Sequence, residues 1–245
     1  MQPAIIVPTL EEVDNIVPLV DQIEQTNVPF SEIVFVDDGS LDGTREKIHA
    51  LTATHRVRLI ERDGAERGLA GAILAGGRDS AADVFVVMDA DLSHPPEKIA
   101  ALLGPILANE ADLVIGSRYI GGGATPGWPA WRRFLSRVAS AVAYPLTGVR
   151  DSMGGFFAVR RECLLRFADQ AAGFKIVFEM VVRGRGSLRV CEVPIVFRDR
   201  QRGTSKMSLA QAIRFAMAWT RAIARRVTQG SNRAQSLPAE KAHGS

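Results

Sequence analysis

Two acidic residues, Asp89 and Asp91, follow directly on the apolar run Val84–Met88. The β-branched and aromatic residues of this run predict a buried strand, so both carboxylates stand at its carboxyl end. Free carboxylates at this spacing repel each other, and a hard divalent cation would neutralise them. An ion held by one or two carboxylates keeps coordination positions for substrate phosphates, as Mg²⁺ prefers. Because Asp-x-Asp alone is a weak signal, a capped turn before the helix that starts at Pro95 and Pro96 is the alternative interpretation.

A second acidic pair, Asp37 and Asp38, ends the apolar run Glu32–Val36. Carboxylates at a strand end can accept hydrogen bonds from a base or a ribose. The residues that follow are typical of a turn and a helix cap rather than of a ligand site. They are Ser40, Asp42, Gly43 and Thr44.

Basic residues follow two later strand-like runs. Arg118 lies in Gly116-Ser117-Arg118-Tyr119, directly after Leu113–Ile115. The segment Arg198–Lys206 carries several basic residues around Gly203. Such a segment suits a loop that folds over phosphates, and a solvated run of charge is the alternative.

Short β-branched runs alternate with helical patterns along the chain, which predicts a mainly parallel sheet with helices on both faces. The predicted strands are Ala4–Val7, Glu32–Val36, Val57–Glu61, Val84–Met88, Leu113–Ile115 and Val190–Phe197. The predicted helices are Glu11–Gln25, Asp42–His49, Leu69–Gly77, Pro96–Leu107 and Trp128–Tyr144. In open α/β sheets, ligands bind beyond the carboxyl ends of the strands, which is where the acidic and basic residues above stand.

Length and composition agree with one large α/β domain. The chain has 245 residues, 47% of them hydrophobic, and its net charge of +3 does not indicate a nucleic-acid-binding protein. No secretory signal precedes the first predicted strand, and no run reaches the ~18 apolar residues of a membrane span. Cys163 and Cys191 give neither a metal-ligand spacing nor a disulfide framework, which fits a reducing cytoplasm.

The C-terminal part has a different pattern. Residues 208–227 read as one helix with an apolar face and with Arg214, Arg221 and Arg225 on the opposite face. This pattern favours an interfacial helix on a membrane, and a core helix is the alternative. From 228 to 245 the chain is polar, which predicts disorder. We therefore expect a catalytic domain over residues 1–207, an amphipathic helix and a tail.

Taken together, these motifs resemble those of family 2 glycosyltransferases, in the dolichol- or polyprenol-phosphate mannosyltransferase branch. The resemblance covers about residues 4 to 207, with the motifs in order and correctly spaced. They are Val7-Pro8-Thr9, Val36-Asp37-Asp38-Gly39-Ser40, Gly43-Thr44, Gly68-Leu69, Asp89-Ala90-Asp91-Leu92-Ser93-His94-Pro95, Gly116-Ser117-Arg118-Tyr119, Glu192-Val193-Pro194-Ile195 and Gly203-Thr204-Ser205-Lys206.

The resemblance implies a GT-A fold and a peripheral enzyme at the cytoplasmic face of a membrane. It implies inverting transfer of a sugar, mannose from GDP-mannose, to a polyprenyl or dolichyl phosphate with Mg²⁺ or Mn²⁺, and it leaves room for a small membrane-protein partner. The nucleoside would be held by Pro8, Glu12, Val36 and Asp38. Ala90 and Asp91 would meet the diphosphate and the metal, and Asp89 and Ser93 would complete the ion's shell. Arg118, Arg200 and Lys206 would neutralise phosphates of donor and acceptor.

A phosphate acceptor is already an anion at neutral pH, so the reaction needs no general base. This agrees with the sequence, in which His55 and His94 read as loop or cap residues rather than as acids or bases. Three positions depart from the family pattern: Leu10 and Glu11 stand where the family usually has tyrosine and asparagine, and Phe157 where relatives often have arginine. The loss of the tyrosine removes a stacking contact with the nucleotide base, so a UDP-glucose-dependent polyprenyl-phosphate glucosyltransferase is one alternative. A catalytically silent nucleotide-binding scaffold is an alternative of a different class, against which the intact Asp89-Ala90-Asp91 and Lys206 argue.

Overall fold

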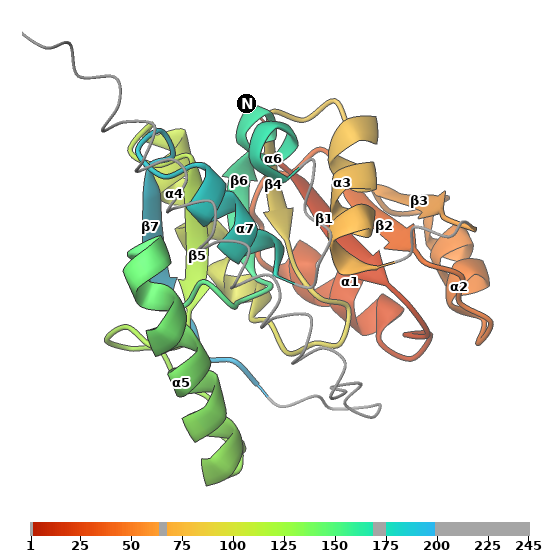
Figure 1. Ribbon diagram of the computed structural model, residues 1–245. Coiled ribbons are helices and arrows are strands. Elements are labelled where there is room, and N and C mark those ends of the chain that lie inside the picture. The colour runs from red at the N-terminus through yellow and green to blue at the C-terminus, as the bar shows by residue number, and fades with distance from the viewer. Residues whose placement is uncertain (1, 64–67, 169–174, 199–245) are drawn as a thin grey trace, which may run out of the picture. The chain divides into compact units, whose positions relative to one another are not determined.

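The computed structural model describes residues 2–63, 68–168 and 175–198 (Figure 1). Arg200, Lys206, the predicted helix 208–227 and the tail 228–245 lie outside these residues. The predictions about them are therefore not addressed by the fold described below.

Within the described residues, seven strands form one sheet in the order β3-β2-β1-β4-β6-β5-β7. The strands are β1 (Ala4–Thr9), β2 (Ile33–Asp37), β3 (Val57–Glu61), β4 (Val84–Val87), β5 (Leu113–Ser117), β6 (Phe157–Arg160) and β7 (Val190–Pro194). β6 runs antiparallel to its neighbours β4 and β5, and the other pairs are parallel. The chain builds outward from β1 to β3 and then returns to place β4 on the other side of β1. This reversal makes the carboxyl ends of β1 and β4 the expected ligand-binding edge.

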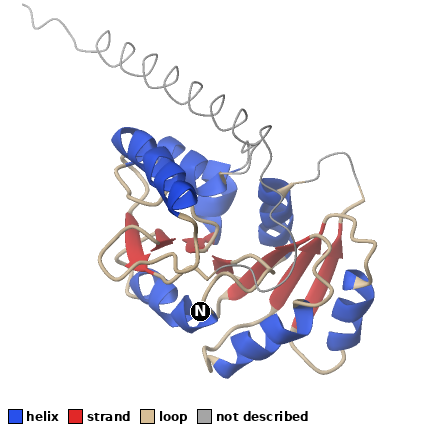
Figure 2. Ribbon diagram, turned by 90° about the horizontal axis from the view of Figure 1, so that it is seen from below, coloured by secondary structure: helices blue, strands red, loops and turns tan. Residues whose placement is uncertain are grey.

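Helices cover both faces of the sheet (Figure 2). The helices are α1 (Ile16–Gln25), α2 (Thr44–Leu51), α3 (Leu69–Asp79), the 3-10 turn η1 (Pro96–Lys98), α4 (Ile99–Leu107), α5 (Ala130–Thr147), α6 (Arg161–Ala168) and α7 (Ile176–Arg183). Successive strand residues point to opposite faces. Ile5 and Val7 therefore join the core beneath α1, α2 and α4. Ala4 and Ile6 join the core beneath α3, α6 and α7.

The predicted fold class, a mostly parallel sheet with helices on both faces, is confirmed. Several details differ from the prediction. β6, α6 and α7 were not predicted, and β7 ends at Pro194 rather than at Phe197. α1 begins at Ile16 rather than at Glu11. Glu11 has a left-handed backbone with φ of 55°, and its N–H is held by the Ser40 hydroxyl at 2.8 Å. A contact with a residue far along the chain thus replaces the first helical turn that the local pattern suggested.

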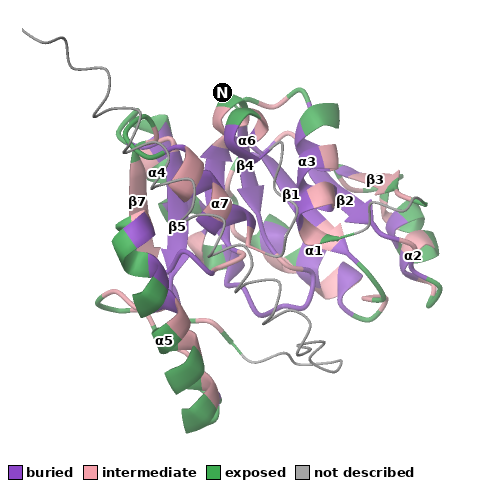
Figure 3. Ribbon diagram, viewed as in Figure 1, coloured by how far each residue is buried: buried purple, intermediate pink, exposed green. Residues whose placement is uncertain are grey.

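α5 differs from the other helices in its exposure. It lies against α7 and buries only Ser140, Ala143 and Leu146, while most of its remaining surface is exposed (Figure 3). None of the helices in the described part of the chain combines the length and the apolar character that crossing a membrane requires.

Candidate functional site

The loop after β4 carries the predicted metal ligands at the sheet's switch point. The side chain of Asp89 is 35% exposed, whereas Asp91 and Ser93 are buried. The loop folds tightly because an Asp91 carboxylate oxygen accepts the N–H of Ser93 at 3.1 Å. The Ser93 hydroxyl is fully buried and finds no hydrogen-bond partner in the described part of the chain. The three predicted ligand residues are thus brought together in one loop.

The donor atoms of this loop suit a hard cation, since they are carboxylate and hydroxyl oxygens. The described residues contain no group of three or more His, Cys, Asp or Glu side chains close enough to hold a metal by themselves. An ion here would need further ligands from a substrate or from water. The backbone of Gly155 lies close to the Asp89 carboxylate, because a methyl group added there would be 3.4 Å from both oxygens.

The predicted nucleoside residues lie at the ends of β1 and β2. Pro8 pairs in register with Val36, and the N–H of Asp38 donates to the carbonyl of Thr9 at 3.0 Å. The side chain of Glu12 stays close to its own segment, where it accepts the amide of Asn15 at 2.6 Å. Sequence-distant residues therefore converge at one edge, as predicted.

Asp38 is almost buried and its carboxylate already accepts two donors. One oxygen accepts Nη1 of Arg62 at 2.7 Å and the other accepts the N–H of Gly68 at 2.6 Å. The carboxylate thereby ties the segment after β3 to the end of β2. A base or ribose bound at Asp38 would share or replace one of these donors.

The neighbouring Asp37 has a structural role. It is fully buried, and it accepts hydrogen bonds from the hydroxyl and N–H of Ser40, the N–H of Gly39 and Nε of Arg45. Asp42 accepts the N–H of Thr44, the first residue of α2, at 3.0 Å. These contacts confirm the turn and cap interpretation of this segment.

Arg118, at the end of β5, is fixed by a buried carboxylate. Asp151 accepts Nε and Nη2 of Arg118, each at 2.8 Å, and also its backbone N–H at 2.9 Å. Glu192 of β7 in turn accepts the backbone N–H groups of Arg150 and Asp151, at 2.8 and 2.9 Å. This arrangement fixes the arginine in one orientation at the same edge as the acidic loop.

A second cation, Lys175, stands close to this pair. Its ammonium group donates to the carbonyl of Met153 at 3.2 Å. Burial lowers the pKa of Lys175, and the nearby charge of Arg118 lowers it further, against the opposing effect of Asp151 and Asp89. Lys175, Asp151 and Glu192 are not among the site residues that the sequence predicts.

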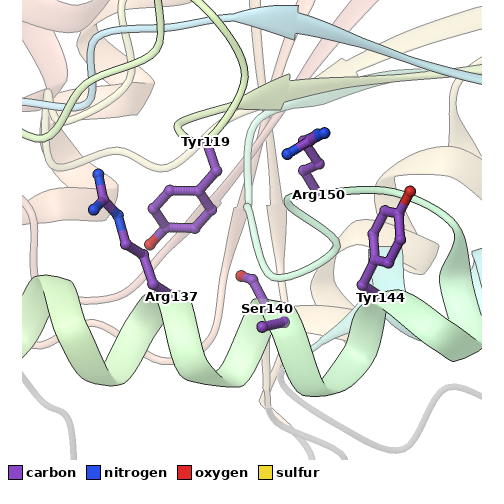
Figure 4. Close-up of a pocket in the computed structure, with 6 residues that line it drawn as sticks. Tyr119, Arg137, Ser140, Tyr144 and Arg150 are labelled. Carbon is purple, nitrogen blue, oxygen red and sulfur yellow. The ribbon is translucent and has the colours of Figure 1, made fainter.

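A pocket of about 400 Å³ opens between α5 and the loops beside Arg118 (Figure 4). It is lined by Tyr119, Arg137, Ser140, Ala141, Tyr144 and Arg150. Figure 4 shows Arg137, Ser140 and Tyr144 on one helix, facing Tyr119 and Arg150 across the pocket. The hydroxyl of Ser140 is buried and has no partner among the residues described. Cationic and hydroxyl groups of this kind are donors suited to an anion.

After β7 the chain crosses the ends of these strands. Val196 pairs with Ala124, and the N–H of Arg198 donates to the carbonyl of Ser93 at 3.0 Å. The described chain thus ends beside the acidic loop. Arg200 and Lys206 follow Arg198 in sequence but lie outside the described residues.

Comparison with known proteins agrees with this geometry. Residues 4–170 match the family model "Glycosyl transferase family 2". The chain is 40% identical over 212 residues to a dolichol-phosphate mannosyltransferase of Pyrococcus furiosus, a match that covers 84% of this chain and 59% of that protein. The chain therefore spans less than two thirds of that relative's length. It is 39% identical over 216 residues to a polyprenol monophosphomannose synthase of Mycolicibacterium smegmatis, covering 83% of this chain and 80% of that one.

Among solved structures, the fold is similar to that of glucosyl-3-phosphoglycerate synthase from Mycobacterium tuberculosis, crystallised with Mn²⁺, UDP-glucose and phosphoglyceric acid. The TM-score is 0.71 at 19% identity, with 92% of this chain and 79% of that chain covered. This likeness confirms the predicted GT-A type of fold. On the family model and the identity to these relatives, the chain belongs to glycosyl transferase family 2.

Proposed function

We propose that this protein is an inverting glycosyltransferase that transfers mannose from GDP-mannose to a polyprenyl or dolichyl phosphate. The observation that carries the proposal is the pairing of acidic and basic groups at one edge of the sheet. The Asp89–Ser93 loop supplies oxygen ligands for a cation, and Arg118 supplies a fixed guanidinium group for a phosphate. The printed names of the two relatives above, a dolichol-phosphate mannosyltransferase and a polyprenol monophosphomannose synthase, favour this acceptor and this sugar.

On the donor side, Asp89, Asp91 and Ser93 would hold Mg²⁺ or Mn²⁺. The residues fit such an ion, because the buried Ser93 hydroxyl has no partner among the described residues and the Asp89 carboxylate is partly open. The bound ion would neutralise negative charge on the leaving diphosphate. Ala90 would lie along this diphosphate, and Pro8, Glu12, Val36 and Asp38 would hold the nucleoside.

On the acceptor side, the protein's task is to align two anions. Arg118 is held rigidly by Asp151, which leaves its other guanidinium N–H groups available to a phosphate. The pocket beside Tyr119 extends this cationic region with Arg137 and Arg150. We place the phosphate end of the acceptor at Arg118 and the entry path along this pocket.

Arg200 and Lys206 complete the proposed set of cations. The described chain ends with the N–H of Arg198 bound to Ser93. We propose that both residues neutralise phosphates, with Gly203 between them giving the segment its freedom to close.

The acceptor is a lipid, so the enzyme must meet a membrane surface, which we place at the cytoplasmic face. α5 carries exposed Trp131, Phe134 and Leu135, together with several arginines and no acidic residue. An apolar surface combined with basic residues is typical of helices that lie in the interface of an anionic membrane. We propose peripheral binding through α5 and through residues 208–227.

Replacement of Asp91 by alanine tests the proposal. We expect mannose transfer to polyprenyl phosphate to fall by at least about 100-fold, because metal stabilisation of the leaving group is worth several kcal/mol. The measurement is transfer of radiolabel from GDP-mannose in detergent, with Mg²⁺, with Mn²⁺ and with EDTA, and circular dichroism checks the fold. Asp21→Ala, an exposed position on α1, is the matched control. Near-normal transfer by Asp91→Ala that EDTA still abolishes would place the metal elsewhere.

A further inference from the structure

His94 closes the acidic loop at its far end. The side chain is 2% exposed, and its Nδ1 accepts the backbone N–H of Asp89 at 2.9 Å. The hydrogen bond spans the loop from its first residue to its last. The two carboxylates and the Ser93 hydroxyl therefore lie on a segment whose ends are joined by the imidazole ring.

The partner of Nδ1 fixes the tautomer of the ring. A backbone N–H can only donate, so Nδ1 is the unprotonated nitrogen and the proton of the neutral ring lies on Nε2. Nε2 is 3.7 Å from a carboxylate oxygen of the same Asp89, too far for a hydrogen bond but within ion-pair range. The imidazole ring of His94 thus binds the main chain of Asp89 through Nδ1, and its own Nε2–H lies near the Asp89 carboxylate.

Aromatic neighbours fix the orientation of the imidazole. His94 stacks on Phe156 with ring centroids 5.1 Å apart and an interplanar angle of 13°. Phe197 meets it edge-on at 5.4 Å. A Cβ added at Gly155 would touch both His94 and the Asp89 carboxylate at 3.4 Å, so the glycine backbone leaves room for both groups. The ring is packed between elements that come from three parts of the chain.

The loop also contains a backbone conformation that requires support. Leu92 has φ of 61°, in the left-handed region that a branched aliphatic residue rarely adopts. Such a conformation persists only where its surroundings determine it. The bond from Asp89 to His94 and the turn between Asp91 and Ser93 hold the backbone on both sides of Leu92, and its side chain is buried in the core.

We propose that His94 is the positioning residue of the metal site, acting through Asp89 and not as a ligand or a proton donor. This inference rests on the proposed function, because it takes Asp89 and Asp91 as the ligands. The hydrogen bond that Nδ1 accepts would fix the distance between the Asp89 and Asp91 carboxylates before the metal binds. Groups that orient metal ligands typically change metal affinity by about 10- to 100-fold when they are removed.

Three substitutions separate this role from simple packing. His94→Asn keeps an acceptor oxygen near the place of Nδ1 but removes the ring. His94→Phe keeps the ring and removes both nitrogens. His94→Gln moves its polar atoms toward the place of Nε2 and leaves the N–H of Asp89 without its acceptor. His49→Phe, on the exposed surface of α2, is the matched control.

The measurement is the dissociation constant of Mn²⁺ for the full chain, obtained from the electron paramagnetic resonance signal of free Mn²⁺. We expect it to rise by about 10- to 100-fold in His94→Phe and His94→Gln, and by less than about tenfold in His94→Asn. The control should bind as the wild type does. Thermal unfolding of each variant confirms that it is folded before the affinities are compared.

Wild-type affinity in a folded His94→Phe would overturn the proposal, as would equal affinities in His94→Asn and His94→Gln. The second comparison stands even if His94→Phe does not fold. The metal assignment itself is tested separately on the wild type and on Asp91→Ala. A wild type that binds no Mn²⁺ would overturn the proposed function and this inference together. Loss of Mn²⁺ binding in Asp91→Ala, together with wild-type affinity in a folded His94→Phe, would overturn only the inference.

Discussion

Arg118 owes its position to two carboxylates from distant parts of the chain. Asp151 is fully buried and holds the guanidinium group, and Glu192 holds the backbone of Asp151. Removing either member of the buried Arg118–Asp151 pair would leave an uncompensated charge, which is strongly destabilising. Glu192 therefore supports the position of Arg118 without contacting it, on the side of the site where we propose that the acceptor binds.

Glu192→Gln should weaken this support while keeping the shape of the side chain. One of the two backbone N–H groups at Arg150 and Asp151 would lose a carboxylate acceptor, which lowers the free energy of unfolding by about 1–2 kcal/mol. We expect the KM for the polyprenyl phosphate to rise more than the KM for the donor. Steady-state kinetics with each substrate varied is the measurement, with Glu24→Gln on the surface as control. Equal rises in the two constants would contradict a specific role on the acceptor side.

Asp37 predicts a pH dependence of stability. Burial alone would raise its pKa, but the hydrogen bonds from Ser40 and Arg45 outweigh burial, so the pKa lies below its ordinary value of 3.8. A carboxyl group whose pKa is lower in the folded state stabilises the fold fully above the ordinary value. That contribution is lost as the pH falls through the lower, folded value.

Asp37→Asn should therefore lower the free energy of unfolding by about 2–4 kcal/mol at pH 7, where the buried charge-assisted bonds are intact. The gap between wild type and variant should narrow as the pH falls below about 4. Urea unfolding at pH 7 and at pH 3.5 or so measures this gap, and Asp21→Asn is the control. A gap that did not change with pH would show that the charge of Asp37 is not the cause.

Sequence alone could identify the acidic loop and Arg118, because residues of the right chemical type end predicted strands there. It could not identify Asp151, whose bond to Arg118 joins residues 33 positions apart, or Glu192, 41 positions from its partner. His94 was interpreted as a loop or cap residue, and only the contact with the N–H of Asp89 shows what it closes. A local sequence pattern shows which donor and acceptor atoms a residue has, but it does not predict which distant residue will contact them.

At the scale of elements, the long parallel strands were predictable and β6 was not. β6 has only four residues, Phe157–Arg160, and it enters antiparallel between β4 and β5. Its partners lie far away in sequence, so no periodicity marks the pairing. The consequence for the site is direct, because β6 brings Gly155 and Phe156 against the acidic loop.

α5 is the element with the clearest expected membrane role. Most of α5 is exposed (Figure 3). Phe134 and Leu135 are 67% and 56% exposed, and the exposed Trp131 lies on the same helix. Each such side chain contributes about 1.5–3 kcal/mol when it is fully buried in an apolar phase. Phe134→Ser with Leu135→Ser should therefore weaken binding to anionic vesicles by about 10- to 100-fold, even if burial at the interface is partial.

Flotation of the full chain with vesicles that contain an anionic lipid is the measurement. Leu107→Ser, at an exposed apolar position on α4, is the matched control and should float as the wild type does. Unchanged flotation of the double variant would assign membrane binding to another part of the chain.

At the scale of the whole catalytic domain, the strand order separates two regions around the acidic loop. β1 and β2 carry the predicted nucleoside residues on one side of the switch point. β5, β6 and β7 carry or support Arg118 on the other side, beside α5 and its pocket. In the proposed mechanism, the donor and the acceptor would therefore meet at the acidic loop between these two regions.

The residues on the nucleoside side of the acidic loop predict which base the donor carries. The identity of this base is open because Leu10 stands where the family usually has a tyrosine. The buried carboxylate of Asp38 accepts two donors, Arg62 and Gly68, one on each oxygen. Guanine presents two adjacent donors on its pairing edge, an N–H and an amino group, whereas uracil presents one N–H. Each carboxylate oxygen can accept more than one hydrogen bond, so Asp38 could accept both guanine donors beside Arg62 and Gly68, which would match guanine better than uracil.

We expect kcat/KM for GDP-mannose to exceed that for UDP-glucose by at least about 1,000-fold, because a mismatched base leaves buried polar groups unpaired. Asp38→Asn should lower kcat/KM for GDP-mannose by about 10- to 100-fold, since an amide offers guanine one acceptor oxygen and an opposing amino group. Transfer from each radiolabelled donor to the same polyprenyl phosphate measures both effects, and Asp63→Asn, at a largely exposed position, is the control. Turnover of UDP-glucose with none of GDP-mannose would overturn the assignment of the donor, and it would leave the fold and the acidic loop as they are.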